Sequence, residues 1–154
     1  MQIYIIRHGE TDWNTKRLLQ GATDIPLNQN GIEAARLTAE ALKEIPFDEI
    51  YTSPLQRAVQ TAEIMRGDRR IPIIKDERLK EISFGPYEGL CCGKEGYSIP
   101  DPEFVNFFQN PAHYNPPEGG ESIAQLCVRT TDFLTELIEN PDNREKTILL
   151  SGHG

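Results

Sequence analysis

The sequence contains few cysteines. Only three occur among 154 residues, two of them adjacent at Cys91 and Cys92, and none belongs to a C-x-x-C pair. An odd set of thiols does not form a complete disulfide framework, and structural zinc sites need spaced cysteine or histidine ligands. We therefore expect neither disulfides nor zinc, and a cytoplasmic, reducing location.

Long apolar runs and an excess of positive charge are also absent. The apolar run at 3–6 ends at Arg7, which is too short for a signal peptide or a membrane span. The net charge is −8. Nucleic acids and anionic membranes bind proteins through basic faces, so we expect neither partner. A phosphate site in this protein must gather its positive charge locally, which screening over about 10 Å permits.

Short apolar runs predict buried strands at 50–52 and 147–150 in addition to 3–6. A fourth run, at 71–74, contains Pro72 and predicts an edge strand. No repeat or linker-like composition divides the chain, so we expect one domain over residues 1–154.

Helices are predicted between these strands. Residues 32–45 have helical apolar spacing, and Ser53-Pro54 has the pattern of a capping box with proline at the first helical position of a helix to Arg66. A short helix is expected at 101–108. A long helix should begin at Ser122, with an apolar stripe that places Cys127 toward the core. Alternating strands and helices indicate an α/β fold with a mostly parallel sheet and ligands at the carboxyl ends of its strands.

Residues able to handle phosphate follow four of the expected elements. Arg7 and His8 come after the first strand, and His153 after the last. Arg57 lies in the first turn of its helix, where the helix dipole favours an anion, and Glu81 lies in the loop beyond the third strand. Two histidines, two arginines and a glutamate should therefore meet at one rim of the sheet.

Phosphoryl transfer needs a positioned nucleophile and neutralisation of charge on the phosphate oxygens. An imidazole can be the nucleophile, and arginines can bind phosphate bidentately without a metal ion. His153 and Asn14 can add further donors. Glu81, among apolar neighbours that raise its pKa, can protonate the leaving oxygen and then activate water. Taken singly, each of these two residues has an ordinary alternative: an ion pair with Glu63 on the helix face for Arg57, and simple solvation in a loop for Glu81.

Six blocks of sequence occur in the order typical of one family. They are RHGETDWN, LQGATDIPLNQNG, YTSPLQRAVQTA, LKEISFGPYEG, PPEGGES and SGHG. Together they resemble the signature of the phosphoglycerate mutase-like histidine phosphatases along the whole chain. The resemblance implies a three-layer α/β/α fold and no metal or organic cofactor. It also implies roles for individual residues: His8 as nucleophile, Glu81 as proton donor, His153 with Arg7, Asn14 and Arg57 as phosphate ligands, and Gln20 and Gly21 close to them.

The chain departs from this family pattern in two places. Family members usually continue past the second histidine with another helix and closing strands, which we expect this chain to lack. An exposed sheet edge and a tendency to form a homodimer should result. The interval before PPEGGES is short, with only Lys94 and His113 as candidate cations for a substrate carboxylate, which favours phosphatase over mutase.

The sequence therefore predicts a metal-independent phosphatase of small phosphorylated metabolites that works through a phosphohistidine on His8. A cofactor-dependent phosphoglycerate mutase and an inactive phosphate-binding module are the alternatives. The leaving group of the substrate is left open, because the phosphate ligands are encoded far more clearly than the residues that surround the rest of the substrate.

Overall fold

A four-stranded sheet lies at the centre of the structure, a computed structural model that describes residues 1–154. Its strands are β1 Gln2–Arg7, β2 Glu49–Thr52, β3 Ile73–Lys75 and β4 Thr147–Gly152. They run in the order β1-β4-β2-β3, and each neighbouring pair is parallel. The last strand in the sequence is thus inserted between β1 and β2, and the predicted parallel α/β class is confirmed.

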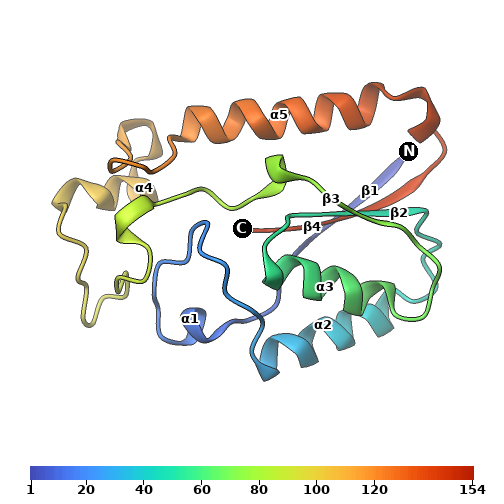
Figure 1. Ribbon diagram of the computed structural model, residues 1–154, viewed down its shortest axis with the longest axis horizontal. Coiled ribbons are helices and arrows are strands. Elements are labelled where there is room, and N and C mark those ends of the chain that lie inside the picture. The colour runs from blue at the N-terminus through green and yellow to red at the C-terminus, as the bar shows by residue number, and fades with distance from the viewer.

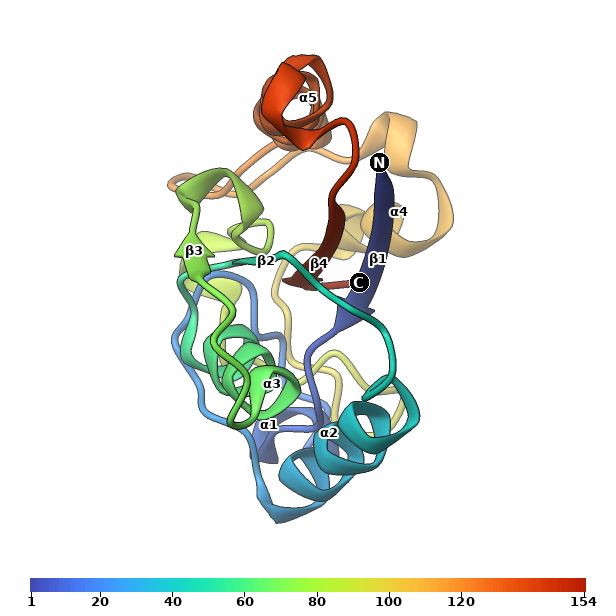
Figure 2. The ribbon, with the colours of Figure 1, turned by 90° about the vertical axis from the view of Figure 1, so that its right-hand side faces the viewer.

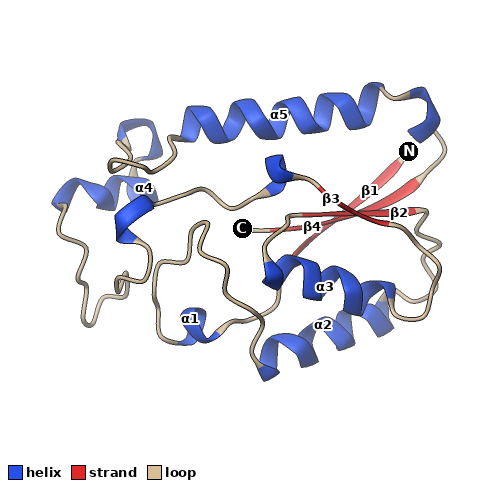
Figure 3. Cartoon of the chain, viewed as in Figure 1, coloured by secondary structure: helices blue, strands red, loops and turns tan.

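Helices cover both faces of this sheet. The α-helices are α1 Asp12–Thr15, α2 Gln29–Ala41, α3 Gln56–Arg66, α4 Asn106–Gln109 and α5 Ile123–Glu139. Helices α2 and α3 lie on one face and α5 on the other, which gives the expected three layers (Figures 1 and 2). Short 3-10 helices occur at Glu77–Leu79, Gly85–Tyr87, Pro102–Val105, Pro111–His113 and Pro141–Asn143. Loops and short helices occupy the chain between β3 and α5 (Figure 3). No helix is both long and apolar enough to cross a bilayer.

Strand β4 supplies apolar side chains to both faces because successive residues of a strand point in opposite directions. Ile148 and Leu150 pack with Phe133 and Leu137 of α5. Leu149 points the other way, into a cluster formed with residues of β2, α3 and the adjoining loops. All three β4 residues are buried, so the strand is fixed in the middle of the sheet with its end, Gly152, at the rim.

Two helix starts differ from the prediction. Helix α2 begins three residues earlier than expected, because the Asn28 side chain caps it by accepting from the Gly31 N–H at 2.9 Å. Helix α3 begins at Gln56, and its N-cap Leu55 has no side-chain cap. The capping box predicted at Ser53 was therefore wrong, although Arg57 does lie in the first turn.

The apolar stripe of α5 is only partly covered. Phe133 and Leu137 are buried, whereas Leu134 and Ile138 are exposed. Cys127 is exposed as well, so its expected position in the core was wrong. Strand β1 pairs on one side only, and Ile5 on it is 72% exposed. An exposed sheet edge is thus present, while the homodimer remains a prediction.

Candidate active site

The carboxyl ends of β1 and β4 bring two histidines together. Arg7 and Gly152 are partners in the β1–β4 register, and the His8 N–H donates to the Gly152 carbonyl at 3.0 Å. The imidazole rings of His8 and His153 consequently lie with their centroids 5.2 Å apart. Residues 145 positions apart in the sequence therefore meet at the rim where the fold class predicted a site.

The His8 ring is buried, with 8% of the residue exposed, and its Nδ1 lies 2.7 Å from the Gly9 carbonyl oxygen. A carbonyl only accepts, so Nδ1 carries the proton of the neutral ring and Nε2 keeps its lone pair. Burial lowers the pKa of His8 to about 4; the Gly9 carbonyl opposes this shift, and Arg57 and Arg7 add to it. His8 is thus an uncharged potential nucleophile at neutral pH.

Glycine at position 9 lets the loop after β1 run against the start of α2. A Cβ on Gly9 would lie 2.4 Å from the Gly31 carbonyl oxygen. This distance is too short for a contact between a Cβ and a backbone oxygen, so a residue larger than glycine would displace the backbone. The Gly9 N–H in turn donates to Thr61 Oγ1 of α3 at 3.2 Å. These two contacts fix the backbone that orients the His8 ring.

His153 follows β4, and its Nε2 lies 2.8 Å from Ser53 Oγ. Burial lowers the pKa of this imidazole to about 2, and the charges of Arg57, His8, Arg129 and Arg7 lower it further. The second ring nitrogen, Nδ1, is buried and has no partner in the protein. A buried polar atom without a partner is costly, which points to a ligand as its partner.

Arg57 is completely buried, and no ion pair of the structure involves it. Its Nη1 donates to the Thr23 carbonyl at 2.8 Å and its Nη2 to the Gly21 carbonyl at 2.7 Å, while its buried Nε has no partner. Burial lowers the pKa of the guanidinium, and Glu81, Asp24 and Glu88 oppose that shift. The group stays protonated near neutrality. Its positive charge is therefore buried without a directly bonded carboxylate.

Thr11 orients the two predicted amide ligands. Its backbone N–H donates to Asn14 Oδ1 at 3.0 Å, which assigns the oxygen end of that amide and leaves the NH₂ end free. Its hydroxyl lies 2.9 Å from Gln20 Oε1 and so holds that amide in place without assigning which of its two ends faces the site. Asn14 lines one cavity together with Arg7 and His8.

Glu88 holds the loop that carries the carbonyl partners of Arg57. Its carboxylate accepts from the Ala22 N–H at 3.0 Å, from the Phe84 N–H at 2.9 Å and from the Thr23 hydroxyl. Gly21 adopts φ +52°, and a Cβ there would lie 2.2 Å from Glu88 Oε1. The structure therefore places Gly21 beside Arg57 as a carbonyl acceptor that only glycine allows.

Glu81 lies in the loop after the 3-10 helix at Glu77–Leu79 and lines a cavity of about 300 Å³ together with His153. Burial raises the pKa of its carboxyl group; the Ile82 N–H, Arg57, Arg7 and Arg129 oppose that shift. Its Oε1 accepts from the Ile82 N–H at 3.0 Å. A carboxyl group of raised pKa that lines a cavity with His153 is suited to proton transfer.

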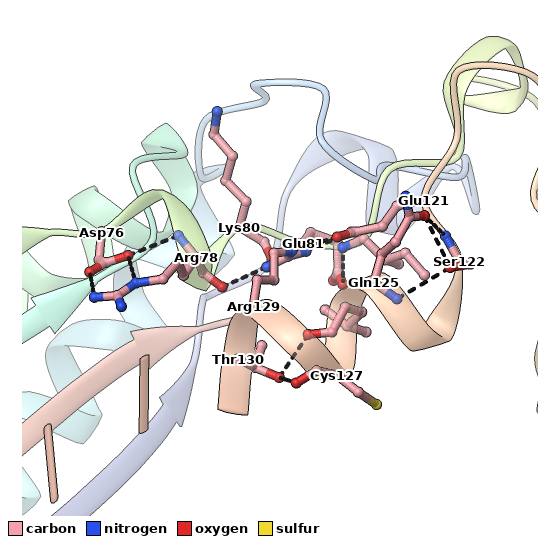
Figure 4. Close-up of polar contacts among 12 residues, drawn as sticks. Asp76, Arg78, Lys80, Glu81, Glu121, Ser122, Gln125, Cys127, Arg129 and Thr130 are labelled. Carbon is pink, nitrogen blue, oxygen red and sulfur yellow. Dashed lines mark hydrogen bonds and ion pairs between the residues drawn. The ribbon is translucent and has the colours of Figure 1, made fainter. Parts of the chain in front are cut away.

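Helix α5 holds the Glu81 segment through Arg129 (Figure 4). Arg129 Nη1 donates to the carbonyls of Arg78 and Lys80 at 2.6 and 2.7 Å. Its Nε and Nη2 donate to the two carboxylate oxygens of Glu121 at 2.6 and 2.7 Å. The Glu121 N–H donates to the Ser83 carbonyl at 2.7 Å. Backbone on both sides of Glu81 is therefore fixed to the start of α5.

The structure thus gathers Arg7, His8, Asn14, Arg57, Glu81 and His153 at one rim, with Gln20 and Gly21 beside them through Thr11 and Arg57. No group of three or more His, Cys, Asp or Glu side chains is arranged to hold a metal ion.

Four supporting residues were missed from the sequence. They are Thr11, Ser53, Glu88 and Arg129. Arg129 had a usable signal, since it is a charged residue between Leu126 and Phe133 on the inward stripe of α5. Thr11 had one as well, because it forms a capping box with Asn14 three residues further on. Ser53 and Glu88 act on partners distant in the sequence, which local patterns do not reveal.

Comparison with known proteins identifies relatives of the chain. The family model described as the histidine phosphatase superfamily (branch 1) matches residues 3–154. An uncharacterised phosphatase, PhoE of Bacillus subtilis, is 35% identical over 99% of this chain and 71% of its own length. A 2,3-bisphosphoglycerate-dependent phosphoglycerate mutase of Cytophaga hutchinsonii is 30% identical, with the same two coverages.

Solved structures agree with this relationship. Bacillus stearothermophilus YhfR superposes with a TM-score of 0.90 at 37% identity, covering 99% of this chain and 73% of its own. A phosphoserine phosphatase variant of Entamoeba histolytica in complex with phosphoserine has a TM-score of 0.78 at 36% identity, covering 98% and 73%. The fold, the match over nearly the whole chain and the geometry of the two histidines agree: the chain belongs to the histidine phosphatase superfamily, branch 1.

Proposed function

We propose that the protein hydrolyses phosphomonoesters of small metabolites through a phosphohistidine on His8, without a metal ion. One observation carries the proposal: the buried Arg57 guanidinium has no carboxylate bonded to it, and its Nε, like the Nδ1 of nearby His153, is a buried nitrogen without a partner in the protein. A phosphate dianion supplies both the negative charge and the acceptor oxygens that these groups lack.

The first chemical step uses His8 and Glu81. The lone pair of His8 Nε2, left free by the Nδ1 contact with Gly9, attacks phosphorus as the ester P–O bond breaks. Protonated Glu81, whose pKa is raised by burial, gives its proton to the leaving oxygen. Arg7, Arg57, Asn14 and His153 bind the equatorial oxygens during transfer, and the Gln20 amide adds a donor beside them. An alcohol leaves and a phosphohistidine remains.

The second step returns the enzyme to its starting state. Glu81, now a carboxylate, takes a proton from a water molecule, whose oxygen attacks phosphorus while the P–N bond to His8 breaks. The electron pair of that bond returns to Nε2, and inorganic phosphate is released. Each group thus finishes in the protonation state in which it began, so the cycle needs no redox partner or cofactor.

The first test is turnover of p-nitrophenyl phosphate and of phosphoserine, the ligand named in the Entamoeba histolytica complex, in excess EDTA. We expect turnover in the chelator and its loss in His8→Ala, with the exposed His113→Ala as the matched control for p-nitrophenyl phosphate, which has no carboxylate. Binding of inorganic phosphate or vanadate without turnover by the folded protein would instead support an inactive phosphate-binding module.

A phosphoglycerate mutase is the second candidate, favoured by the Cytophaga hutchinsonii relative. A mutase returns the phosphoryl group from His8 to a substrate hydroxyl instead of to water. Incubation with 3-phosphoglycerate and catalytic 2,3-bisphosphoglycerate separates the two activities, because an isomerised product appears only with a mutase and stoichiometric inorganic phosphate only with a phosphatase.

A further inference from the structure

Ser53 occupies the corner between the end of β2 and the His153 ring. It is completely buried, and its Oγ lies 2.8 Å from His153 Nε2. The same oxygen accepts from the Leu55 N–H at 3.3 Å. The hydroxyl is thus held between a backbone donor and one nitrogen of the imidazole, while the other ring nitrogen, Nδ1, is buried without a protein partner.

A neutral imidazole carries a single proton, so its tautomer decides which nitrogen donates and which accepts. Burial lowers the pKa of His153 to about 2, and the ring is uncharged at neutral pH. With the proton on Nε2, the ring would donate to Ser53 Oγ, the buried serine proton would have no acceptor, and a bare Nδ1 would face the site. With the proton on Nδ1, Ser53 accepts from Leu55 and donates to Nε2. The first arrangement leaves two buried groups without a protein partner, the serine proton and the Nδ1 lone pair, whereas the second leaves only the Nδ1–H, which a ligand can take.

We infer that Ser53 is a positioning residue that fixes His153 in its Nδ1–H tautomer, so that this ring presents an N–H donor to the phosphate. The identity of the ligand rests on the proposed function, whereas the tautomer follows from the contacts of Ser53 and the neutral charge of the ring.

The neighbours of the two histidines fix opposite tautomers in the two rings. The Gly9 carbonyl is an acceptor, so it binds the His8 Nδ1–H and leaves a lone pair on Nε2. The Ser53 hydroxyl is a donor toward Nε2 of His153, so it leaves an N–H on Nδ1. One ring becomes a nucleophile and the other a hydrogen-bond donor, although both are neutral and lie at the same rim.

The experiment is nitrogen-15 NMR of the chain labelled at histidine, with the three imidazoles assigned through His8→Gln and His113→Gln. In the wild-type protein we expect His153 to be protonated on Nδ1. In Ser53→Ala the Nε2–H form should appear, and Ser53→Thr, which keeps the hydroxyl, should restore the wild-type pattern. Ser151→Ala is the matched control, because Ser151 is equally buried but its hydroxyl donates to the Ala58 carbonyl at 2.9 Å.

Binding of inorganic phosphate is measured on the same proteins by isothermal calorimetry. Loss of one hydrogen bond to a charged ligand predicts an affinity weaker on the order of 10- to 100-fold in Ser53→Ala, against less than about 3-fold in Ser151→Ala. A wild-type ring protonated on Nε2, or a Ser53→Ala ring that keeps the Nδ1 proton, would overturn the inference; the wild-type spectrum decides even if Ser53→Ala fails to fold. The expected tautomers without phosphate binding would support the role of Ser53 and refute the proposed function.

Discussion

Acid should destabilise this protein well above the pH at which its carboxylates are protonated. The folded pKa values of His8 and His153, about 4 and about 2, lie below the 6.5 of an unperturbed imidazole. Below pH 6.5 the unfolded chain therefore binds protons that the folded chain does not bind. The free energy of unfolding consequently falls as the pH falls through this range.

The magnitude follows from the linkage relation. At pH 5 an unfolded imidazole is almost fully protonated while either buried ring is still neutral, which costs about 2 kcal/mol per histidine relative to pH 8. This value hardly depends on the folded pKa as long as the latter stays below about 4.5. The two rings together predict a loss of about 4 kcal/mol, a large part of the roughly 5–15 kcal/mol that stabilises a typical domain.

Equilibrium unfolding in urea at pH 8, 7, 6 and 5, followed by the fluorescence of Trp13, the only tryptophan, measures this loss. His8→Gln and His153→Gln should each reduce the decrease between pH 8 and pH 5 by about 2 kcal/mol. Burial raises the pKa of Glu81, so this carboxyl group makes the folded protein more stable as the pH falls. All four proteins contain Glu81, so its contribution largely cancels when their decreases in stability are compared. The exposed His113→Gln is the control and should leave the decrease unchanged. Equal decreases in all four proteins would refute the burial of neutral imidazoles.

Three further predictions concern activity. Arg57→Lys keeps the charge but loses the fork that spans the Gly21 and Thr23 carbonyls, so kcat/KM for p-nitrophenyl phosphate should fall at least about 100-fold, as steady-state kinetics can show. In Glu81→Gln the pH-rate profile should lose the limb set by that carboxyl group; an unaltered profile and rate would exclude its role as proton donor. Arg129→Gln should lower kcat about 10- to 100-fold and move the Glu81 limb to higher pH, because a cation that lowers the pKa of Glu81 is removed. Arg78→Gln, which breaks the ion pairs with Asp76, Asp132 and Glu136 but leaves the Arg129 contacts in place, is its control and should change neither quantity appreciably.

Local patterns were sufficient to predict the strands and most helices. The buried apolar runs at β1 and β4 and the capped apolar stripe of α5 are signals that a few neighbouring residues carry. The insertion of β4 between β1 and β2 is not local, because it depends on pairing Gln2 with Thr147 and Glu49 with Ile148. The rule that ligands gather at the carboxyl ends of parallel strands nevertheless predicted that His8 and His153 meet at one rim, since it holds for any order of the strands.

Ser53 illustrates why the remainder of the site was not predicted. Its sequence context has the pattern of a capping box, and a local interpretation assigns its hydroxyl to the first turn of α3. In the structure that hydroxyl contacts His153, 100 residues away. Arg129 and Glu88 likewise act on loops that only the tertiary fold brings near them. The proposed phosphate ligands can therefore be predicted from motifs, whereas the contacts that orient them depend on the tertiary fold.

The two imidazoles lie in a buried environment beside Arg57, whose positive charge has no directly bonded carboxylate. This arrangement connects the proposed chemistry of the site with the acid sensitivity of the fold. Burial keeps His8 unprotonated and so able to attack phosphorus, and the charge of Arg57 lowers its pKa further. The same burial makes protonation of the folded chain unfavourable, which causes the loss of stability below pH 6.5. A variant such as Arg57→Gln should thus raise the pKa of His8 and reduce the acid sensitivity, while it weakens phosphate binding. The variant would gain stability in acid by losing a group on which the proposed activity depends. Such a trade-off between stability and activity is expected when a site is built from buried, incompletely paired polar groups.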